Sequence, residues 1–371
     1  MRIGVPAEIK SGEFRVGMVP ASVQELCAAG HELLVQTGAG AAIGFADADY
    51  AAAGARVVAG GAEAWAAELV VKVKEPQAVE FGLLRADQVL FTYLHLAPDL
   101  RQTEALQRAG VVAIAYETVT DRDGRLPLLA PMSAVAGRMA VQVGAHFLEK
   151  THGGRGILLG GVPGVAPGRV TVLGAGTVGA NAVSMATGLG AEVTVLDCIR
   201  QRLDALDREY RGDVRTRMAD PADIEESVCR ADLVIGAVLQ AGGPAPKLID
   251  RALLKKMRHG AVIVDVAIDQ GGCCETSHPT THADPVFVEE GVLHYCVANM
   301  PGAVPLTSAL ALSNATLPYL HALAGKGWRQ ALRDDPGLAA GLNVCAGQIT
   351  HRAVAEALGK SFKTPADFVA A

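Results

Sequence analysis

Aromatic residues are scarce in this sequence, since Phe, Trp and Tyr together make up 4% of its 371 residues. Half of the residues are hydrophobic nonetheless, and glycine is frequent, with 42 residues. Small apolar side chains suit helices packed closely on a parallel sheet better than a β-sandwich. The length fits two domains, each with its own core.

Long apolar runs and basic runs are missing as well. No window approaches the ~20 apolar residues that span a membrane, and the start, MRIGVPAEIK, is too polar for a signal peptide. A formal net charge of −6 gives no electrostatic basis for binding nucleic acid or an anionic membrane surface. We therefore expect a soluble, cytoplasmic protein with neither nucleic acid nor membrane as a partner.

The seven cysteines form no recognisable disulfide or metal pattern. Their odd number and irregular spacing predict free thiols in a reducing compartment. Cys273 and Cys274 are adjacent and do not form a CxxC knuckle, so we interpret them as small buried hydrophobic residues. The sequence thus predicts no metal site.

Short apolar runs separated by helical stretches predict parallel strands in two series. The first series covers 2–5, 31–36, 69–73, 88–93 and 111–116, and the second covers 170–173, 192–196, 233–236, 261–266 and 293–296. Between them, Val135, Met139, Val143 and Phe147 recur at four-residue spacing and predict a helix over 133–150 with one buried face. From Thr307 the pattern is helical almost to the end.

We expect the final helices to pack on the first sheet, because they have no sheet of their own to cover. The predicted fold is therefore α/β, with two Rossmann-like domains, each a mainly parallel sheet covered by helices. Residues 1–128 and 306–371 would form a discontinuous substrate domain, and 129–305 an inserted NAD-binding domain. The active site is expected in the cleft between them.

A glycine fingerprint indicates the nucleotide site. The predicted strand at 170–173 leads into Gly174-Ala175-Gly176-Thr177-Val178-Gly179, and a predicted helix and a second strand follow. Gly174 permits the tight turn, Gly176 lets a pyrophosphate approach the backbone, and Gly179 lets the helix pack on the sheet. The N–H groups at the start of the helix would bind the phosphates.

Asp197 ends the second strand of this unit, about 20 residues after the glycines, where an acid accepts hydrogen bonds from the adenosine ribose. Its charge would repel a 2′-phosphate, which favours NAD over NADP. Arg200 and Arg202 lie near enough to weaken that preference.

Ordered motifs along nearly the whole chain resemble the alanine dehydrogenase family. They are MRIGVPAEIK, then EFRV at 13–16, VKVKEP at 71–76, TYLHLA at 92–97, LLAPMSAVAGRMA at 128–140, GGVPGVAP at 160–167, DVAIDQGG at 265–272, ETSHPTTH at 275–282 and YCVANMPGAVP at 295–305. The resemblance implies reversible oxidative deamination of L-alanine to pyruvate and ammonia with NAD. It also implies a homo-oligomer, a homo-hexamer in many relatives.

Four residues match the family's substrate site. Arg15 would hold the substrate carboxylate by a charged pair, and Lys74 would bind that carboxylate or polarise the keto oxygen. His95 would be a general acid or base, because the pKa of histidine lies near neutral pH. Asp269 follows a strand end and would share the proton transfers; which of His95 and Asp269 performs each step stays open.

Further matches imply contacts to the cofactor. Besides the glycines, they are Ser133, Thr177, Val178, Asp197, Arg202, Val238, Leu239, Val266, Ala267, Ile268, Asp269, Val297, Ala298, Asn299 and Met300. The chain departs from the family pattern at Ala134, Ala219, His278 and Leu306. These departures concern the site mouth, subunit contacts and the hold on the cofactor, and none removes a predicted catalytic group.

Three alternatives remain from sequence. One is the nucleotide-binding subunit of a proton-pumping transhydrogenase, which shares the RIG-P start but generally lacks the histidine of TYLHLA. Another is a dehydrogenase acting on another small amino acid or keto acid. The third is an NAD-binding sensor without catalysis, against which the set of Arg15, Lys74, His95 and Asp269 argues.

Overall fold

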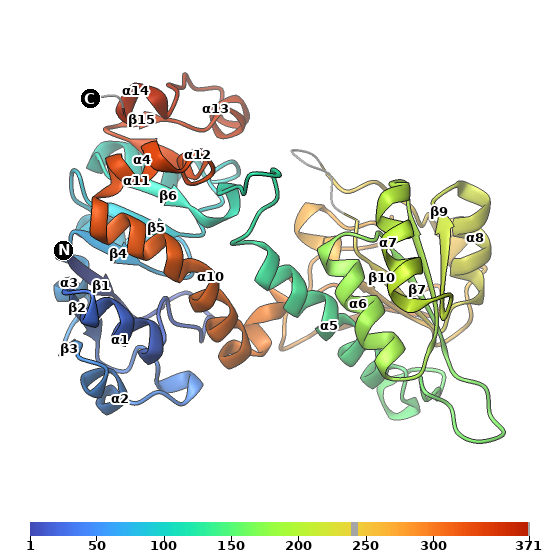
Figure 1. Ribbon diagram of the computed structural model, residues 1–371. Coiled ribbons are helices and arrows are strands. Elements are labelled where there is room, and N and C mark those ends of the chain that lie inside the picture. The colour runs from blue at the N-terminus through green and yellow to red at the C-terminus, as the bar shows by residue number, and fades with distance from the viewer. Residues whose placement is uncertain (239–243, 370–371) are drawn as a thin grey trace. The chain divides into compact units, whose positions relative to one another are not determined.

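The computed structural model describes residues 1–238 and 244–369. The chain forms two compact units, one of Met1–Met132 with Val304–Ala371 and the other of Ser133–Ala303 (Figure 1). Each unit is a mainly parallel sheet with helices on it, which confirms the predicted α/β class. No helix among the described residues is long and apolar enough to cross a membrane.

The first unit contains an eight-stranded sheet in the order β15-β14-β6-β5-β4-β1-β2-β3. Its strands are β1 (Arg2–Val5), β2 (Glu32–Gln36), β3 (Arg56–Val58), β4 (Leu69–Val71), β5 (Val89–Thr92), β6 (Val112–Ala115), β14 (Leu342–Cys345) and β15 (Gln348–Ile349). Strands β1 to β6 pair in parallel in the Rossmann order 3-2-1-4-5-6.

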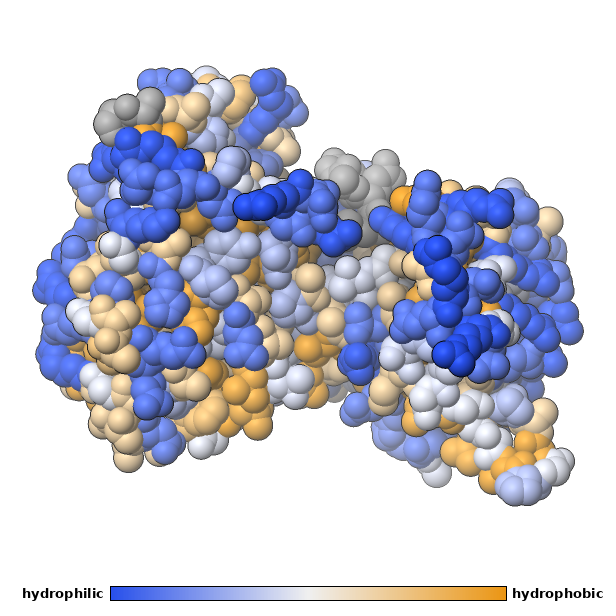
Figure 2. Space-filling model, in the orientation of Figure 1, coloured by the Kyte–Doolittle hydropathy of each residue, from blue (hydrophilic) through white to orange (hydrophobic). Residues whose placement is uncertain are grey.

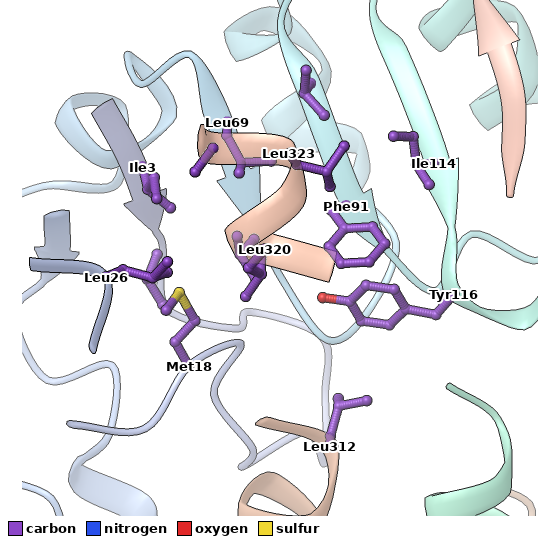
Figure 3. Packing of buried hydrophobic residues seen from close by; sticks show 14 of the residues in the cluster. Ile3, Met18, Leu26, Leu69, Phe91, Ile114, Tyr116, Leu312, Leu320 and Leu323 are labelled. Atoms are coloured by element: carbon purple, nitrogen blue, oxygen red, sulfur yellow. The ribbon is translucent and has the colours of Figure 1, made fainter. Parts of the chain in front are cut away.

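Helices from both ends of the chain cover this sheet. They are α1 (Pro20–Ala28), α2 (Asp47–Ala52), α3 (Gly61–Trp65), α4 (Leu100–Ala109), α10 (Pro305–Lys326), α11 (Trp328–Asp334), α12 (Pro336–Ala340), α13 (Arg352–Leu358) and α14 (Ala366–Val369). Figure 3 shows Leu320 and Leu323 of α10 beside Leu69 and Phe91 of the sheet, in one buried cluster. Helix α10 therefore completes the core that the first strands begin.

The second unit contains a seven-stranded sheet in the order β12-β13-β11-β10-β7-β8-β9. Its strands are β7 (Arg169–Leu173), β8 (Glu192–Asp197), β9 (Val214–Met218), β10 (Leu233–Gly236), β11 (Val262–Asp265), β12 (Val286–Glu289) and β13 (Val292–Tyr295), and its helices are α6 (Thr177–Gly188), α7 (Arg200–Tyr210), α8 (Pro221–Arg230) and α9 (Arg251–Leu254). Helix α5 (Ala130–Phe147) begins three residues earlier than predicted and links the units.

Five strands were not predicted: β3, β9, β12, β14 and β15. Four of them, β3, β9, β12 and β15, are edge strands, and β14 pairs with the edge strand β15. Short, partly polar strands at a sheet edge carry little hydrophobic signal. The prediction of helix almost to the end was wrong at 342–349, where β14 pairs antiparallel with β6. Ala346 and Gly347 both have positive φ and make the tight turn of the β14–β15 hairpin.

A loop from 153 to 168 extends from the second unit before β7. Apolar side chains gather on it in Figure 2, and Leu158, Val162 and Val165 are more than half exposed. Backbone hydrogen bonds between Val162 and Val165 close its tip. Exposed apolar side chains on an ordered turn are typical of a contact surface.

Candidate active site

The three predicted substrate residues of the first unit lie just beyond neighbouring strands. Because β1, β4 and β5 are parallel, the segments that follow them meet at one edge of the sheet. Arg15 follows β1, Lys74 follows β4 and His95 follows β5. The strand order reverses between β1 and β4, and ligands of open α/β sheets bind at such a reversal.

Arg15 is buried and is held by Glu13, a residue that sequence reasoning did not single out. Its Nε and Nη2 donate to the Glu13 carboxylate at 2.7 and 2.5 Å, and its backbone N–H donates to the same group at 3.0 Å. Burial raises the pKa of Glu13, but the hydrogen bonds and charge of Arg15 outweigh it and hold that pKa below its usual range. Glu13 therefore stays ionised and fixes the orientation of the guanidinium.

Lys74 is positioned through its backbone. The Glu8 carboxylate accepts from the N–H groups of Val73 at 2.6 Å and Lys74 at 3.4 Å. Glu8 in turn pairs with Lys72, which is fully buried. The end of β4 is thus fixed by a carboxylate from the segment after β1.

The Lys74 ammonium has no hydrogen-bond or ion-pair partner among the residues that the structure describes. Burial lowers the pKa of Lys74, and the positive charges of Arg15 and Lys10 lower it further. The carboxylates of Glu75 and Glu13 act in the opposite direction, but neither forms an ion pair with Lys74. A partly buried cation without a direct ion pair, beside a second cation, is suited to an anionic ligand. A substrate carboxylate would supply the missing negative charge.

His95 is presented by a strained turn. Its φ is +50°, in the left-handed region that residues other than glycine rarely adopt. Glu117, which follows β6, accepts from the backbone N–H of His95 at 2.6 Å and of Leu94 at 3.2 Å. The imidazole lies parallel to the Tyr93 ring, with 6.0 Å between centroids, and is half exposed. Glu117 and Tyr93 therefore set where the imidazole points.

These side chains also interact electrostatically. Burial raises the pKa of Tyr93, while the nearby charge of Arg15 lowers it and that of Glu117 raises it. The structure therefore brings Arg15, Lys74 and His95 together at one sheet edge. Glu13 and Glu117 join them, and a search for acids after each parallel strand would have found Glu117 in the sequence.

The glycine fingerprint forms the turn between β7 and α6 in the second unit. Gly174 has φ +103°, and a Cβ there would lie 2.6 Å from the Ala237 carbonyl oxygen. A Cβ on Gly179 would lie 1.7 Å from the Gly174 carbonyl oxygen. At Gly176 the nearest atom to such a Cβ is Arg202 Nη1, at 3.9 Å, so the space above this residue is open. No side chain caps α6, which leaves its first N–H groups available to phosphates.

Asp197 lies at the end of β8, beside the same turn. Its carboxylate accepts from the N–H groups of Ala175 at 2.6 Å and Ile199 at 2.7 Å, and from Arg202 at 3.3 Å. A carboxylate has about four acceptor positions, so a ribose hydroxyl can still donate to it. Arg200 is exposed and lies 3.8 Å from Asp204.

The remaining predicted cofactor residues are all in the second unit. Ser133 is on α5, Thr177 and Val178 begin α6, and Val238 follows β10. Leu239 lies outside the described residues. Val266, Ala267, Ile268 and Asp269 form a 3-10 turn after β11, and Val297, Ala298, Asn299 and Met300 follow β13. Apart from Ser133, the described members therefore lie on segments that follow parallel strands of the sheet.

Asp269 is exposed at that turn, and its carboxylate has no hydrogen-bond or ion-pair partner within the described parts of the chain. The turn is anchored by Asp265, which accepts from the N–H of Cys273 at 2.8 Å and from the Ser277 hydroxyl at 2.6 Å. Among the departures from the family pattern, His278 stacks on Phe287 with 3.8 Å between ring centroids.

The doubly wound sheet, the glycine turn and the acid at the end of β8 define a dinucleotide-binding α/β protein. Models of the family "Alanine dehydrogenase/PNT" match residues 4–136 with its N-terminal domain and 140–352 with its C-terminal domain. An alanine dehydrogenase of Halomonas elongata is 59% identical over all of both chains. Alanine dehydrogenase of Mycobacterium tuberculosis is 54% identical, also over all of both chains. The chain therefore belongs to the alanine dehydrogenase/PNT family. Membership of this family implies that the chain uses a nicotinamide cofactor.

Solved structures agree with this assignment. An L-alanine dehydrogenase superposes with a TM-score of 0.94 at 53% identity, covering 97% of this chain and 99% of that one. A transhydrogenase from Sinorhizobium meliloti gives a TM-score of 0.83 at 24% identity, covering 94% of this chain and 100% of that one, and shows a shared fold.

Two glycines of α6 give a matched test of the glycine turn. We expect Gly179→Ala to destabilise the protein by about 1–3 kcal/mol, because its Cβ meets a carbonyl oxygen in a packed turn. We also expect it to weaken NADH binding at least tenfold. Gly188→Ala should instead stabilise by about 0.5–1 kcal/mol and leave binding unchanged, because nothing lies within 4 Å of its Cβ. Thermal unfolding and NADH fluorescence titration measure both; equal behaviour of the two variants would contradict the tight-turn role.

Proposed function

We propose that this protein catalyses the reversible NAD-dependent oxidative deamination of L-alanine to pyruvate and ammonia. The proposal rests mainly on two cations and a half-exposed imidazole that lie together where β1, β4 and β5 end. Arg15 and Lys74 suit a carboxylate, and His95 suits proton transfer. The full-length similarity to alanine dehydrogenases supports the substrate.

The reaction converts L-alanine, NAD⁺ and water into pyruvate, ammonium, NADH and one proton. In our proposal Arg15 and Lys74 hold the substrate carboxylate, which fixes Cα and its hydrogen. His95 and Asp269 carry the protons: one leaves the ammonium before oxidation, and others move as water adds to the imine carbon and ammonia leaves. When bound, the nicotinamide ring accepts the hydride from Cα.

The proposed cofactor contacts are those of the glycine turn, of Asp197 and of the segments that follow β10, β11 and β13. The glycine turn between β7 and α6 fits the phosphates of a dinucleotide, because the space at Gly176 is open and no side chain caps the first N–H groups of α6. We propose NAD as the cofactor, since Asp197 is buried beside this glycine turn and its charge would repel a 2′-phosphate. NADPH supporting turnover as well as NADH does would overturn this preference.

One assay tests the reaction. We expect purified protein to oxidise NADH when pyruvate and ammonium are both present, and to reduce NAD⁺ with L-alanine. No turnover with either pair would overturn the proposal. Turnover with glyoxylate or another keto acid in place of pyruvate would redirect the substrate, and hydride transfer between two nucleotides without an amino acid would favour the transhydrogenase alternative.

The lowered pKa of Lys74 predicts a pH effect on substrate binding. Because burial and neighbouring cations disfavour the ammonium, it loses its proton at a lower pH than the ordinary value of 10.5. We expect KM for pyruvate, at saturating ammonium and NADH, to rise with pH before that value is reached. Lys74→Arg keeps its charge throughout this range, so its KM should rise less. Parallel profiles for the two proteins would contradict a carboxylate-binding role for Lys74.

We also propose that the protein assembles as a homo-hexamer. The proposal rests on the family resemblance, and the exposed apolar residues Leu158, Val162 and Val165 offer a surface for contact between copies. Light scattering coupled to size-exclusion chromatography measures the assembled mass, and a monomer of 38.3 kDa at micromolar concentration would contradict it.

A further inference from the structure

Three potential metal ligands converge at the end of α5. They are His146, Glu149 and His152, and one ligand atom of each lies within 4.8 Å of the others. Both imidazoles turn Nδ1 toward the same carboxylate, at 3.9 Å for His146 and 3.4 Å for His152. Two ligand atoms on one tetrahedral zinc ion lie about 3.3–3.5 Å apart, so small side-chain rotations would bring all three onto one ion.

The backbone that carries the cluster is fixed. Helix α5 ends at Phe147, and a 3-10 turn, Lys150–His152, brings the chain back so that residues 146, 149 and 152 face each other. The N–H of Gly154 donates to the Glu149 carbonyl oxygen at 3.1 Å, and a Cβ on Gly154 would lie 2.2 Å from the Phe147 carbonyl oxygen. Phe147 also packs against His152 and Tyr295. The ligand positions are therefore largely set before any ion binds.

The cluster lies at the end of the sheet where the strands begin, whereas the glycine turn lies at the end where they finish. A Cβ on Gly153 would meet Leu293 at the start of β13, and the N–H of Arg155 donates to Gly260, just before β11. Both strands begin at this end, whereas the glycine turn follows the end of β7. Along α5, His146 is about 20 Å from Ser133 at 1.5 Å per residue. A bound ion would therefore not touch the proposed cofactor.

We infer that His146, Glu149 and His152 form a binding site for a divalent transition-metal ion of the zinc class. Two imidazoles and one carboxylate are ligands that zinc prefers, and they distinguish it from calcium and magnesium, which prefer oxygen. All three side chains are at least one-third exposed, so water can complete the coordination. The bound ion would tie the 3-10 turn to the end of α5.

Isothermal titration of the full chain with Zn²⁺, without nucleotide, tests the site. We expect one zinc per chain in the wild type, and at least a tenfold loss of affinity in His146→Ala/His152→Ala. Glu149→Gln keeps the shape of the side chain, removes its charge and should also weaken binding. Because these side chains are exposed, the variants should fold, and an unchanged thermal midpoint without metal checks this.

The matched control is His321→Ala, which removes a histidine that lies 3.6 Å from Glu25 and belongs to no group of three potential ligands among the described residues. It should bind zinc as the wild type does. Co²⁺ gives a second readout: visible bands of a nitrogen and oxygen site should appear in the wild type and the control and vanish in the double variant. Unchanged zinc affinity in the double variant, no binding by the wild type, or a thiolate charge-transfer band would each overturn the inference.

Discussion

His95→Ala is expected to lower kcat for alanine oxidation by about 10²–10⁴-fold, the range typical of losing a general acid or base. The imidazole is half exposed and makes no side-chain hydrogen bond to any residue that the structure describes, so its removal should cost little stability. Both variants His95→Ala and His95→Asn should bind NADH normally, because other residues make the proposed phosphate and ribose contacts, namely the glycine turn and Asp197. Steady-state kinetics in both directions measures the loss.

The Asn variant matters because the backbone of residue 95 has φ +50°. Asparagine tolerates this conformation better than most residues, so it separates loss of the imidazole from a disturbed turn. The control is His321→Ala, which removes a partly exposed histidine of another helix. If His95→Ala and His95→Asn kept turnover within about twofold of the control, His95 would carry no proton in the rate-limiting chemistry.

Lys72→Met is expected to destabilise the protein by about 3–5 kcal/mol. Lys72 is fully buried, and its Nζ lies 3.1 Å from Glu8 and 3.3 Å from Glu80. Burial lowers the pKa of Lys72, but the two carboxylates outweigh this and raise it. Removing the cation would leave two buried carboxylates without their shared partner. Both tryptophans, Trp65 and Trp328, belong to the first unit, so tryptophan fluorescence during urea unfolding reports on it.

The effect should depend on pH. Burial already raises the pKa of Glu8 in the folded protein, and loss of Lys72 would raise it more. A carboxyl group whose folded pKa lies above its unfolded value favours folding when protonated, and this contribution is lost as pH rises through the folded pKa. The Lys72→Met protein should therefore lose less stability, relative to the wild type, as pH falls from 7 toward the raised pKa of Glu8.

An exposed pair provides the control for this experiment. Lys256 lies 2.6 Å from Glu225 with both side chains more than half exposed, so Lys256→Met should change the urea unfolding midpoint far less than Lys72→Met does. Adding Glu8→Gln and Glu80→Gln to Lys72→Met should recover part of the loss, because none of the three charges of this network remains. Equal unfolding midpoints for Lys72→Met and Lys256→Met would show that the buried network contributes no more than a surface pair.

The fold was largely predictable because its signals are local. Central parallel strands such as β1, β7 and β10 are continuous buried apolar runs, and the structure places them within one or two residues of the predicted positions. The edge strands β3, β9 and β12 were not predicted, because a strand with one open side needs fewer apolar residues. Strand β14 was not predicted because it pairs with β6, more than 200 residues earlier, and its four residues alone give little indication of a strand.

The sequence by itself determined the nucleotide turn and the candidate chemistry. The constraint on Gly174 and Gly179 is local, since each glycine contacts backbone within a few residues or one strand away. The types and positions of Arg15, Lys74, His95 and Asp269 could be read in the same way, and their roles stay predictions. Only the tertiary structure decided what holds them. Glu8, in the segment after β1, accepts from the backbone of Lys74 after β4, and Glu117, after β6, accepts from the backbone of His95 after β5. Such contacts depend on strand order, which brings together residues that lie far apart in the chain.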